Sequence, residues 1–257
     1  MRVTTLASGS KGNCVYIEGD DGAVLVDAGL SAREILARLA VAGGKPDLIH
    51  ALLVTHEHGD HIQGVSSLAR KLRVPILGTQ GTLSEVLRTA SSRATPDVIP
   101  CQYNEEIPLS DFLIRPFATS HDALEPCGFC IEEGDLRVGC CTDTGVVSSR
   151  LVDCFRRCDM VILESNHCPE MLENGPYPAM LKRRIRSKKG HLSNTSAGEC
   201  LQELARDVPV IQLAHLSEIN NTPAKALASA REAFGLFVDM VDLSVGLQHG
   251  VSPTKYL

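Results

Sequence analysis

The stretch Leu52-Leu53-Val54-Thr55-His56-Glu57-His58-Gly59-Asp60-His61 decides the fold of this chain. An apolar strand should end at Thr55 and a helix should begin near His61, and three histidines and an aspartate lie within the six residues from His56 onward. Alternate residues of an extended segment point to the same side, so His56 and His58 should face the same ligand. Imidazole and carboxylate together suit divalent zinc, manganese or iron. The pattern therefore predicts a metal site at the end of a buried strand.

Outward from this stretch, short apolar runs alternate with helical patterns along all 257 residues. Hydrophobic residues make up 44% and charged residues 22%, which is ordinary globular composition and excludes a disordered chain. We find no Pro/Ser-rich linker and no repeat, so we expect one domain over residues 1–257. Early strands follow one another as hairpins and later strands alternate with helices, which predicts an α+β fold with sheets inside and helices outside.

Charge and composition limit which binding partners and which cellular location we expect for this protein. The net charge is −6, so any nucleic-acid surface has to be a local basic patch. Trp is absent and aromatic residues are 4%, which disfavours a platform that stacks single-strand bases. The N-terminus has no charged-then-apolar signal region, and no apolar run approaches the ~20 residues that span a bilayer. We therefore expect a cytoplasmic protein with no membrane contact, whose ten cysteines are reduced thiols.

Four further motifs occur in order along the chain, and with the HxHxDH stretch they resemble the signature of the metallo-β-lactamase fold superfamily. The motifs are Val24–Gly29 (VLVDAG), Ser120–Asp122 (SHD), Cys141–Gly145 (CTDTG) and Leu213–Ser217 (LAHLS). The resemblance implies a four-layer αββα fold, in which two mixed sheets are sandwiched between helices. It covers almost the whole chain.

The same resemblance implies a set of metal ligands. His56, His58 and His121 would hold one divalent ion; Asp60, His61 and His215 would hold a second; Asp143 would bridge the two. Asp27 would buttress the metal-binding loop from behind. The two ions are expected to be zinc, manganese or iron.

Finer motifs favour one branch of the superfamily. The segment His121–Phe129 is similar to the pattern around the corresponding histidine of ribonuclease Z and related phosphodiesterases. The segments Ser8–Asn13, Leu163–His167, Gly190–Asn194 and Ala214–Asn221 resemble the bacterial YycJ/WalJ group of nucleases. This implies a metal-dependent DNase with 5′-to-3′ exonuclease activity and a role in mismatch repair. Cys168 stands where this group leads us to expect an aspartate.

A basic segment, Lys182–Lys189, holds six cations in eight residues directly before Gly190 and His191. One interpretation is a track for the phosphate backbone that leads toward the metals. The other is the solvated end of a helix, where cations are favoured. The substrate-binding candidates are Arg183, Arg184, Arg186 and Lys188, together with Ser10, Asn13 and Asn194.

The hypothesis for the reaction is two-metal hydrolysis of a phosphodiester, in which a hydroxide shared by the metals attacks phosphorus. Asp60 would orient the hydroxide. His191, held by Glu164, is the candidate general acid for the leaving oxygen, and His167 is the competing candidate. Either histidine has the alternative role of supporting the metal ligands.

Other functions use the same fold and stay open at this point. A ribonuclease Z-like RNase, or a phosphodiesterase for small molecules or cyclic nucleotides, would need the same site. The segment after His121 argues against a lactam or thioester hydrolase, and the full ligand set argues against a non-catalytic scaffold. Metal identity, cleavage polarity, the choice between DNA and RNA, and oligomeric state are not determined by the sequence.

Overall fold

The computed structural model of this protein describes residues 1–90 and 96–257. These residues cluster into two compact units, each built from separate stretches of the chain. Unit 1 comprises Met1–Ala118, Ala123–Asp135 and Leu247–Leu257, and unit 2 comprises Thr119–Asp122 and Leu136–Gly246. The single domain expected from the sequence stays a prediction, and the two units are described separately below.

Strands of the described residues form two seven-stranded sheets, both of which mix parallel and antiparallel pairs. This confirms the expected α+β class with two mixed sheets and helices around them. No helix within residues 1–90 and 96–257 is both long and apolar enough to cross a bilayer.

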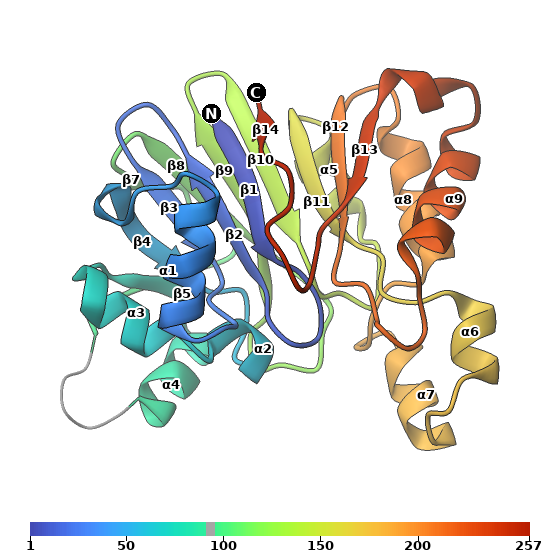
Figure 1. Cartoon of the computed structure of the whole chain (residues 1–257), viewed down its shortest axis with the longest axis horizontal. Coiled ribbons are helices and arrows are strands. Elements are labelled where there is room, and N and C mark those ends of the chain that lie inside the picture. Colours follow the sequence, from blue (N-terminus) through green and yellow to red (C-terminus); the bar gives the residue numbers. More distant parts are fainter. Residues whose placement is uncertain (91–95) are drawn as a thin grey trace. The chain divides into compact units, whose positions relative to one another are not determined.

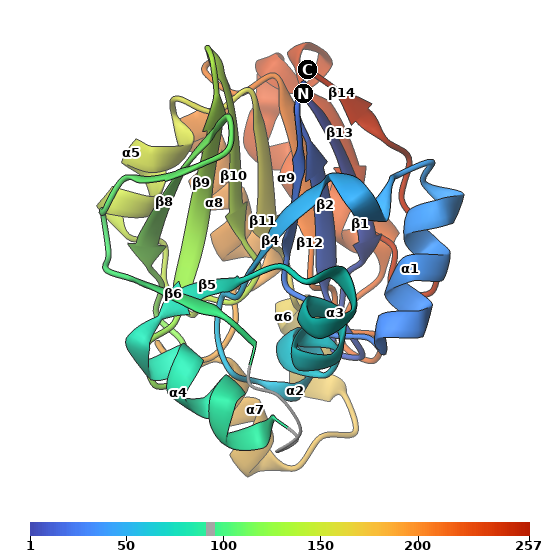
Figure 2. The ribbon, with the colours of Figure 1, turned by 90° about the vertical axis from the view of Figure 1, so that its left-hand side faces the viewer.

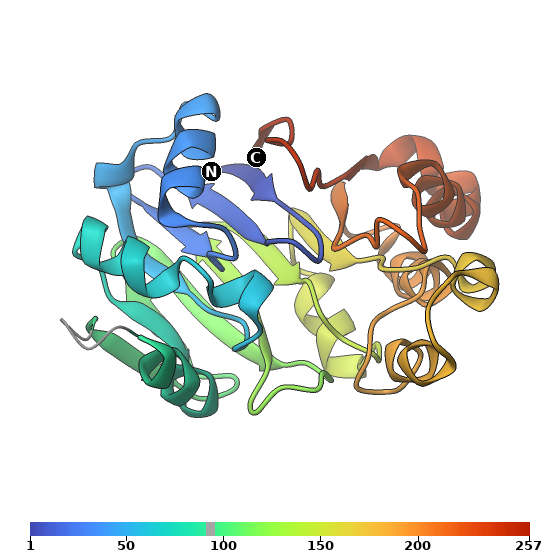
Figure 3. The same cartoon turned by 60° about the horizontal axis from the view of Figure 1, so that its bottom comes forward.

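The first sheet lies in unit 1, and its strand order is β14-β1-β2-β3-β4-β5-β6. Its strands are β1 (Arg2–Ala7), β2 (Cys14–Glu18), β3 (Ala23–Val26), β4 (Ile49–Leu53), β5 (Ile76–Thr79), β6 (Val98–Cys101) and β14 (Lys255–Tyr256). Pairing is antiparallel from β14 to β3 and parallel from β3 to β6. Because β14 pairs with β1, the two ends of the chain lie side by side (Figure 3).

Helices pack on this sheet and share an apolar core with it. They are α1 (Ala32–Val41), the 3-10 turn η1 (Pro46–Leu48), α2 (Gly59–Ile62), α3 (Val65–Leu72) and α4 (Gln80–Thr89). The core joins Leu25 and Leu52 of the sheet to Leu39, Leu68 and Leu83 of α1, α3 and α4, all of them at most 2% exposed. Figure 2 shows these three helices beside the sheet. Three more strands of unit 1 pair antiparallel: β7 (Ile107–Leu109), β8 (Phe112–Ala118) and β9 (Cys127–Glu133).

One expected helix is interrupted. The sequence predicts a single helix over His61–Lys71, but α2 ends at Ile62 and α3 begins at Val65. Gly64 packs so closely on the chain after β3 that a Cβ there would collide with Leu30 O, and its N–H donates to Ala28 O at 2.8 Å. This tertiary contact bends the chain between the two short helices.

Unit 2 is built on four parallel strands in the order β10-β11-β12-β13. Its elements are β10 (Leu136–Cys141), α5 (Ser149–Phe155), β11 (Met160–Glu164), α6 (Pro169–Asn174), α7 (Ala179–Ile185), α8 (Asn194–Leu204), β12 (Val210–Ala214), α9 (Pro223–Phe234), the 3-10 helix η2 (Gly235–Met240) and β13 (Asp242–Val245). Helices α8 and α9 pack against each other, and α9 packs against β13 (Figure 1).

Parallel strands put their carboxyl ends at one edge of the sheet, which is where open α/β sheets bind ligands. Asp143 follows β10, His167 follows β11 and His215 follows β12. The strand directions therefore collect these three side chains at the same edge of unit 2.

Candidate functional site

In unit 1, residues 54–61 form what we call the metal loop, and a buried carboxylate determines where it begins. The Val54 N–H still donates to the neighbouring strand β5 at 2.8 Å. The next N–H, that of Thr55, donates instead to Asp27 Oδ1 at 2.8 Å, and Thr55 Oγ1 donates to the same carboxylate. Strand β4 therefore ends at Leu53, two residues earlier than predicted, and α2 begins at Gly59.

Asp27 occupies an uncommon backbone conformation directly after β3. Its φ is 62°, in the left-handed region that few residues with a Cβ adopt. Its Oδ2 lies 2.7 Å from His61 Nδ1, and both side chains are buried. When a histidine donates its Nδ1–H to a carboxylate, the Nε2 lone pair is left for a metal ion. Asp27 thus holds both Thr55 at the start of the metal loop and His61 at its end.

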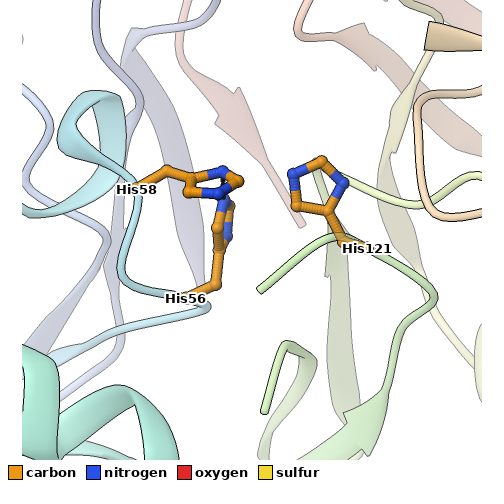
Figure 4. Close-up of side chains that lie close together, drawn as sticks. All are labelled: His56, His58 and His121. Atoms are coloured by element: carbon orange, nitrogen blue, oxygen red, sulfur yellow. Dashed lines mark hydrogen bonds between the residues drawn. The ribbon is translucent and has the colours of Figure 1, made fainter. Parts of the chain in front are cut away.

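His56 and His58 bring their rings together, as Figure 4 shows. His56 Nε2 lies 3.1 Å from His58 Nδ1, and the rings meet edge to face at 81°. The His56 ring is also 4.0 Å from that of His61, centroid to centroid. The prediction that alternate residues of this loop face the same side is confirmed.

Asn13 ties the N-terminal turn to the metal loop. Its N–H donates to Asp60 O at 2.8 Å, and its side-chain oxygen accepts the Gly9 N–H at 2.9 Å. Asn13 Nδ2 lies 3.0 Å from His61 Nε2, so this buried amide lies beside a predicted metal ligand. Ser10 is exposed on the same turn. Phosphate binding by Ser10 and Asn13 stays a prediction.

Glu57 supports the metal loop, and its role was not predicted from the sequence. Its Oε1 accepts the N–H of Leu124 at 2.7 Å, which links the metal loop to the segment after β8. Glu125 of that segment accepts the Gly81 N–H at 2.8 Å, so α4 supports the link in turn. The partner of Glu57 is a backbone group 67 residues away, and no sequence pattern marks such a contact.

In unit 2, Glu164 is the centre of what we call the unit-2 cluster, Asp143, Glu164, His191 and His215. Glu164 is fully buried at the end of β11, and its Oε1 lies 2.7 Å from His191 Nδ1 and 3.0 Å from His215 Nδ1. Its Oε2 accepts the N–H groups of Thr144 and Leu192 at 2.9 and 3.1 Å. One carboxylate therefore joins the chain segments that follow β10 and β12 and the loop before α8.

Asp143 completes the cluster. Its Oδ1 lies 3.2 Å from His215 Nδ1 and 3.3 Å from His191 Nδ1. One ligand atom from each of the four residues falls within 4.8 Å of the others. Two imidazoles and two carboxylates are a donor set that suits zinc, manganese or iron, and burying them together fits a bound divalent cation. The cluster therefore offers donors for a divalent ion. Of its members, Asp143 and His215 are the ligands that the resemblance implies, and Glu164 with His191 is the predicted general-acid pair.

His121 is oriented by the loop that carries His191. Its Nδ1 donates to Gly190 O at 2.9 Å, which leaves Nε2, 3.8 Å from Asp143 Oδ1, for a ligand. Burial lowers the pKa of His121, which favours the neutral ring that a metal ion needs. A Cβ on Gly190 would collide with the backbone oxygens of Ile185 and Arg184, so only glycine fits between α7 and this histidine pair.

His215 resembles Asp27 in its backbone. Its φ is 54°, again left-handed, directly after a strand. Its carbonyl accepts from Asn166 Nδ2 at 2.9 Å, which fixes that conformation from the next loop. Asn194 lies in the same buried network, where its side chain bonds to Ser165 and Asn221. A substrate-binding role for Asn194 stays a prediction, and its amide supports the loop beneath His215.

Protonation within the cluster follows from its contacts. Burial by itself lowers the pKa of His191, but the Glu164 and Asp143 carboxylates outweigh it and raise that pKa to about 11. Burial by itself raises the pKa of Glu164, but His191 and His215 bring it below its usual value. His191 therefore carries a proton at pH 7 and is held by an ionised carboxylate.

A cavity of about 230 Å³ adjoins the cluster within unit 2. Its lining residues are Gly145, His167, Pro169, Arg186, His191, Ser193 and Ser196. His167 is 3% exposed, and burial lowers its pKa to about 4, so its ring is neutral at pH 7. His191 is shared between the cavity and the cluster.

The basic segment forms the end of α7 and the turn after it. Arg184 is paired with Asp122 at 2.6 Å and Arg186 with Glu173, whereas Arg183 and Lys188 are exposed on the same stretch. The carbonyl of Lys188 accepts from Ser120 Oγ at 2.7 Å. Since Ser120 precedes His121, the segment is anchored beside a predicted metal ligand.

Known proteins resemble this chain over most of its length. The family model of the beta-lactamase superfamily domain matches residues 23–215. Exodeoxyribonuclease WalJ of Streptococcus pneumoniae is 36% identical, over 99% of this chain and 94% of its own length. Exodeoxyribonuclease YycJ of Bacillus anthracis is 34% identical, over 90% of this chain and 88% of its own length.

Among solved structures, the metallo-beta-lactamase fold protein YhfI from Bacillus subtilis superposes with a TM-score of 0.76. It is 17% identical and covers 98% of this chain and 99% of its own chain. This likeness confirms the fold class predicted from the sequence.

Proposed function

This chain belongs to the beta-lactamase superfamily, and from that premise we propose that it is a metal-dependent phosphodiester hydrolase that degrades DNA from the 5′ end. The unit-2 cluster carries the proposal, because two proposed metal ligands, Asp143 and His215, and the proposed general-acid pair, Glu164 and His191, lie within 4.8 Å at the carboxyl edge of a parallel sheet. The names of the relatives, exodeoxyribonucleases similar over nearly the whole chain, support DNA as the substrate.

We propose that the protein binds two divalent ions, zinc, manganese or iron. His56, His58 and His121 would hold one ion, Asp60, His61 and His215 would hold the second, and Asp143 would serve both. Such ions neutralise charge on phosphoryl oxygens and make a water acidic enough to attack at neutral pH. The support within unit 1 is that Asp27 orients His61, and within unit 2 that Gly190 orients His121.

The chain's own groups then move the protons. Asp60 orients the attacking water, and its Oδ2 lies 3.6 Å from His61 Nε2. His191 donates a proton to the leaving oxygen, and Glu164 holds its ring through the 2.7 Å contact to Nδ1. His167, the competing general acid, is neutral at pH 7 because burial lowers its pKa to about 4. That difference in protonation favours His191 for this role.

The DNA backbone is proposed to follow the basic segment, through Arg183, Arg184, Arg186 and Lys188, with Ser10, Asn13 and Asn194 as further contacts. Support comes from the anchoring of Lys188 to Ser120, one residue from a proposed ligand. Cytoplasmic location and a part in DNA repair complete the proposal. All ten cysteines are thiols, as a reducing compartment requires.

The central experiment compares end-labelled duplex DNA, single-stranded DNA, RNA and bis-p-nitrophenyl phosphate, each with Mn²⁺ or Zn²⁺. We expect nucleotides to be released from the 5′ end of DNA, and EDTA to stop the reaction. Cleavage of RNA alone would instead identify a ribonuclease Z-like enzyme. Turnover of the nitrophenyl ester alone would identify a small-molecule phosphodiesterase.

The track is tested by the salt dependence of DNA affinity. Replacing Arg183 and Lys188 together with Gln should reduce the log–log salt slope by up to about 1.8, or about 0.9 for each lost phosphate contact. Replacing the exposed Arg150 and Arg231 of unit 2 is the matched control. If both pairs change the slope equally, the basic segment is only a solvated helix end.

A further inference from the structure

The cavity beside His191 is lined by hydrogen-bond donors, and none of the described residues that line it is a carboxylate. Its charged or polar side chains are His167, Arg186, His191, Ser193 and Ser196. Its volume of about 230 Å³ is several times the share of one water molecule, about 30 Å³. A wall of cationic and neutral donors is suited to an anion and unsuited to a metal ion.

Helix α8 directs its N-terminus at this cavity. Ser193 is the N-cap, and its Oγ accepts the Ser196 N–H at 3.0 Å. The same hydroxyl donates to Ser196 Oγ at 3.1 Å, which leaves the Ser196 hydroxyl proton for another acceptor. A helix N-terminus carries partial positive charge and favours phosphate groups.

Arg186 adds a full positive charge from the end of α7. Its terminal nitrogen Nη2 pairs with Glu173, which is 65% exposed, and the guanidinium has further N–H donors in a planar fork. The fork matches the geometry of phosphate oxygens. Arg186 therefore connects the basic segment to the cavity.

His167 provides an independent indication of a ligand. It is 3% exposed and lines the cavity, yet its Nδ1 has no hydrogen-bond partner among the residues that the structure describes. A buried polar atom of this kind costs free energy unless a partner is supplied. A phosphate oxygen in the cavity would supply that partner.

We propose that this cavity binds the terminal 5′-phosphate of the DNA strand, held by Arg186, Ser196 and His167. The inference rests on the proposed function, because it assigns a subsite to the same substrate. His191 belongs to the cavity wall and to the unit-2 cluster, so a phosphate held there keeps the next phosphodiester beside the proposed general acid. A terminal phosphate bound in the cavity would place the first phosphodiester bond at the reacting position. The enzyme would then remove one nucleotide at a time from the end, as an exonuclease does.

The first experiment does not need hydrolysis. Inorganic phosphate is titrated into the full-length protein in EDTA, and binding is measured by calorimetry. We expect Ser196→Ala and Arg186→Gln to weaken binding about 10–100-fold, as the loss of a hydrogen bond to a charged group does. Thr195→Ala, an exposed neighbour on α8, is the matched control and should bind as the parent does. No binding, or equal binding by all four proteins, would overturn the proposal.

The second experiment tests which terminus is bound. Duplexes with a 5′-phosphate, a 5′-hydroxyl or a 3′-phosphate are compared by kcat/KM. We expect the 5′-phosphate to be preferred about 10–100-fold over the 5′-hydroxyl, and Ser196→Ala to reduce this preference. Equal rates, or a preference for the 3′-phosphate, would overturn it. If no DNA is cleaved at all, the proposed function fails, and the phosphate titration still decides whether the cavity is an anion site.

Discussion

The metal loop of unit 1 and the cluster of unit 2 hold similar side chains but are specified in different ways. The metal loop is one stretch of eight residues, 54–61, and Asp27 bonds to Thr55 near its start and to His61 at its end. The unit-2 cluster takes its side chains from three separate strand ends and a loop, and Glu164 joins them. Local sequence therefore specifies the first arrangement, whereas strand order and direction specify the second.

The largest effect should come from removing one ligand on each side of this comparison. His58→Ala in the metal loop and Asp143→Ala in the cluster should each reduce hydrolysis more than ~10³-fold, since metal ions supply several kcal/mol to the transition state. Turnover is measured together with bound metal by elemental analysis. Near-normal activity in either variant would mean that only the other region carries the chemistry.

The two buried carboxylates should differ in what they do for stability. Glu164→Ala leaves two imidazoles and two backbone N–H groups from separate segments without their acceptor, so we expect a loss of about 3–5 kcal/mol. Asp27→Ala affects one short loop, and we expect about 1–3 kcal/mol. Urea unfolding in EDTA measures both. Equal losses would show that the metal loop depends on its carboxylate as strongly as the cluster does.

The buried His167 should make the metal-free protein less stable in acid. Its folded pKa of about 4 lies below the usual histidine value of 6.5, so the unfolded chain binds the proton first as pH falls. Stability is therefore complete above pH 6.5 and decreases toward pH 4, by about 3 kcal/mol in all.

Replacing His167 with Gln should flatten this dependence, measured as urea unfolding across a pH series in EDTA. His249→Gln, at an exposed position, controls for the substitution itself. If His167→Gln loses as much stability between pH 6.5 and pH 4 as the parent does, other groups cause the loss.

Gly190 of unit 2 and Gly59 of the metal loop should differ in how much stability is lost when each is replaced by alanine. Gly190→Ala should cost about 1–3 kcal/mol, because its Cβ meets backbone oxygens of α7 and cannot displace them without moving His191. Gly59→Ala, within the metal loop, meets nothing within 4 Å and should change stability by less than about 1 kcal/mol. Thermal unfolding decides, and a tolerated Gly190→Ala would mean that the loop before α8 adapts freely.

The sequence predicts the central strands of the two sheets better than the outermost strands. The sequence predicts strands over Cys14–Glu18 and Phe112–Ala118, and β2 and β8 have these bounds, because both segments are mainly apolar. The four strands without a prediction, β6, β7, β13 and β14, are the outermost strands of the two sheets within the described residues. An outermost strand has a neighbour on one side only, so a short run with little apolar pattern is enough for it. The short helix α6 was also not predicted.

The grouping of His56 with His58 could be predicted from the sequence, because the two residues are separated by one position in an extended segment. Tertiary structure decided the rest of the site. Gly190 orients His121 across 69 residues, Glu57 reaches Leu124 across 67, and Arg186, His167 and Ser196 line one cavity from separate elements. Such contacts depend on how strands and helices pack, and packing brings together residues whose separation along the chain carries no signal.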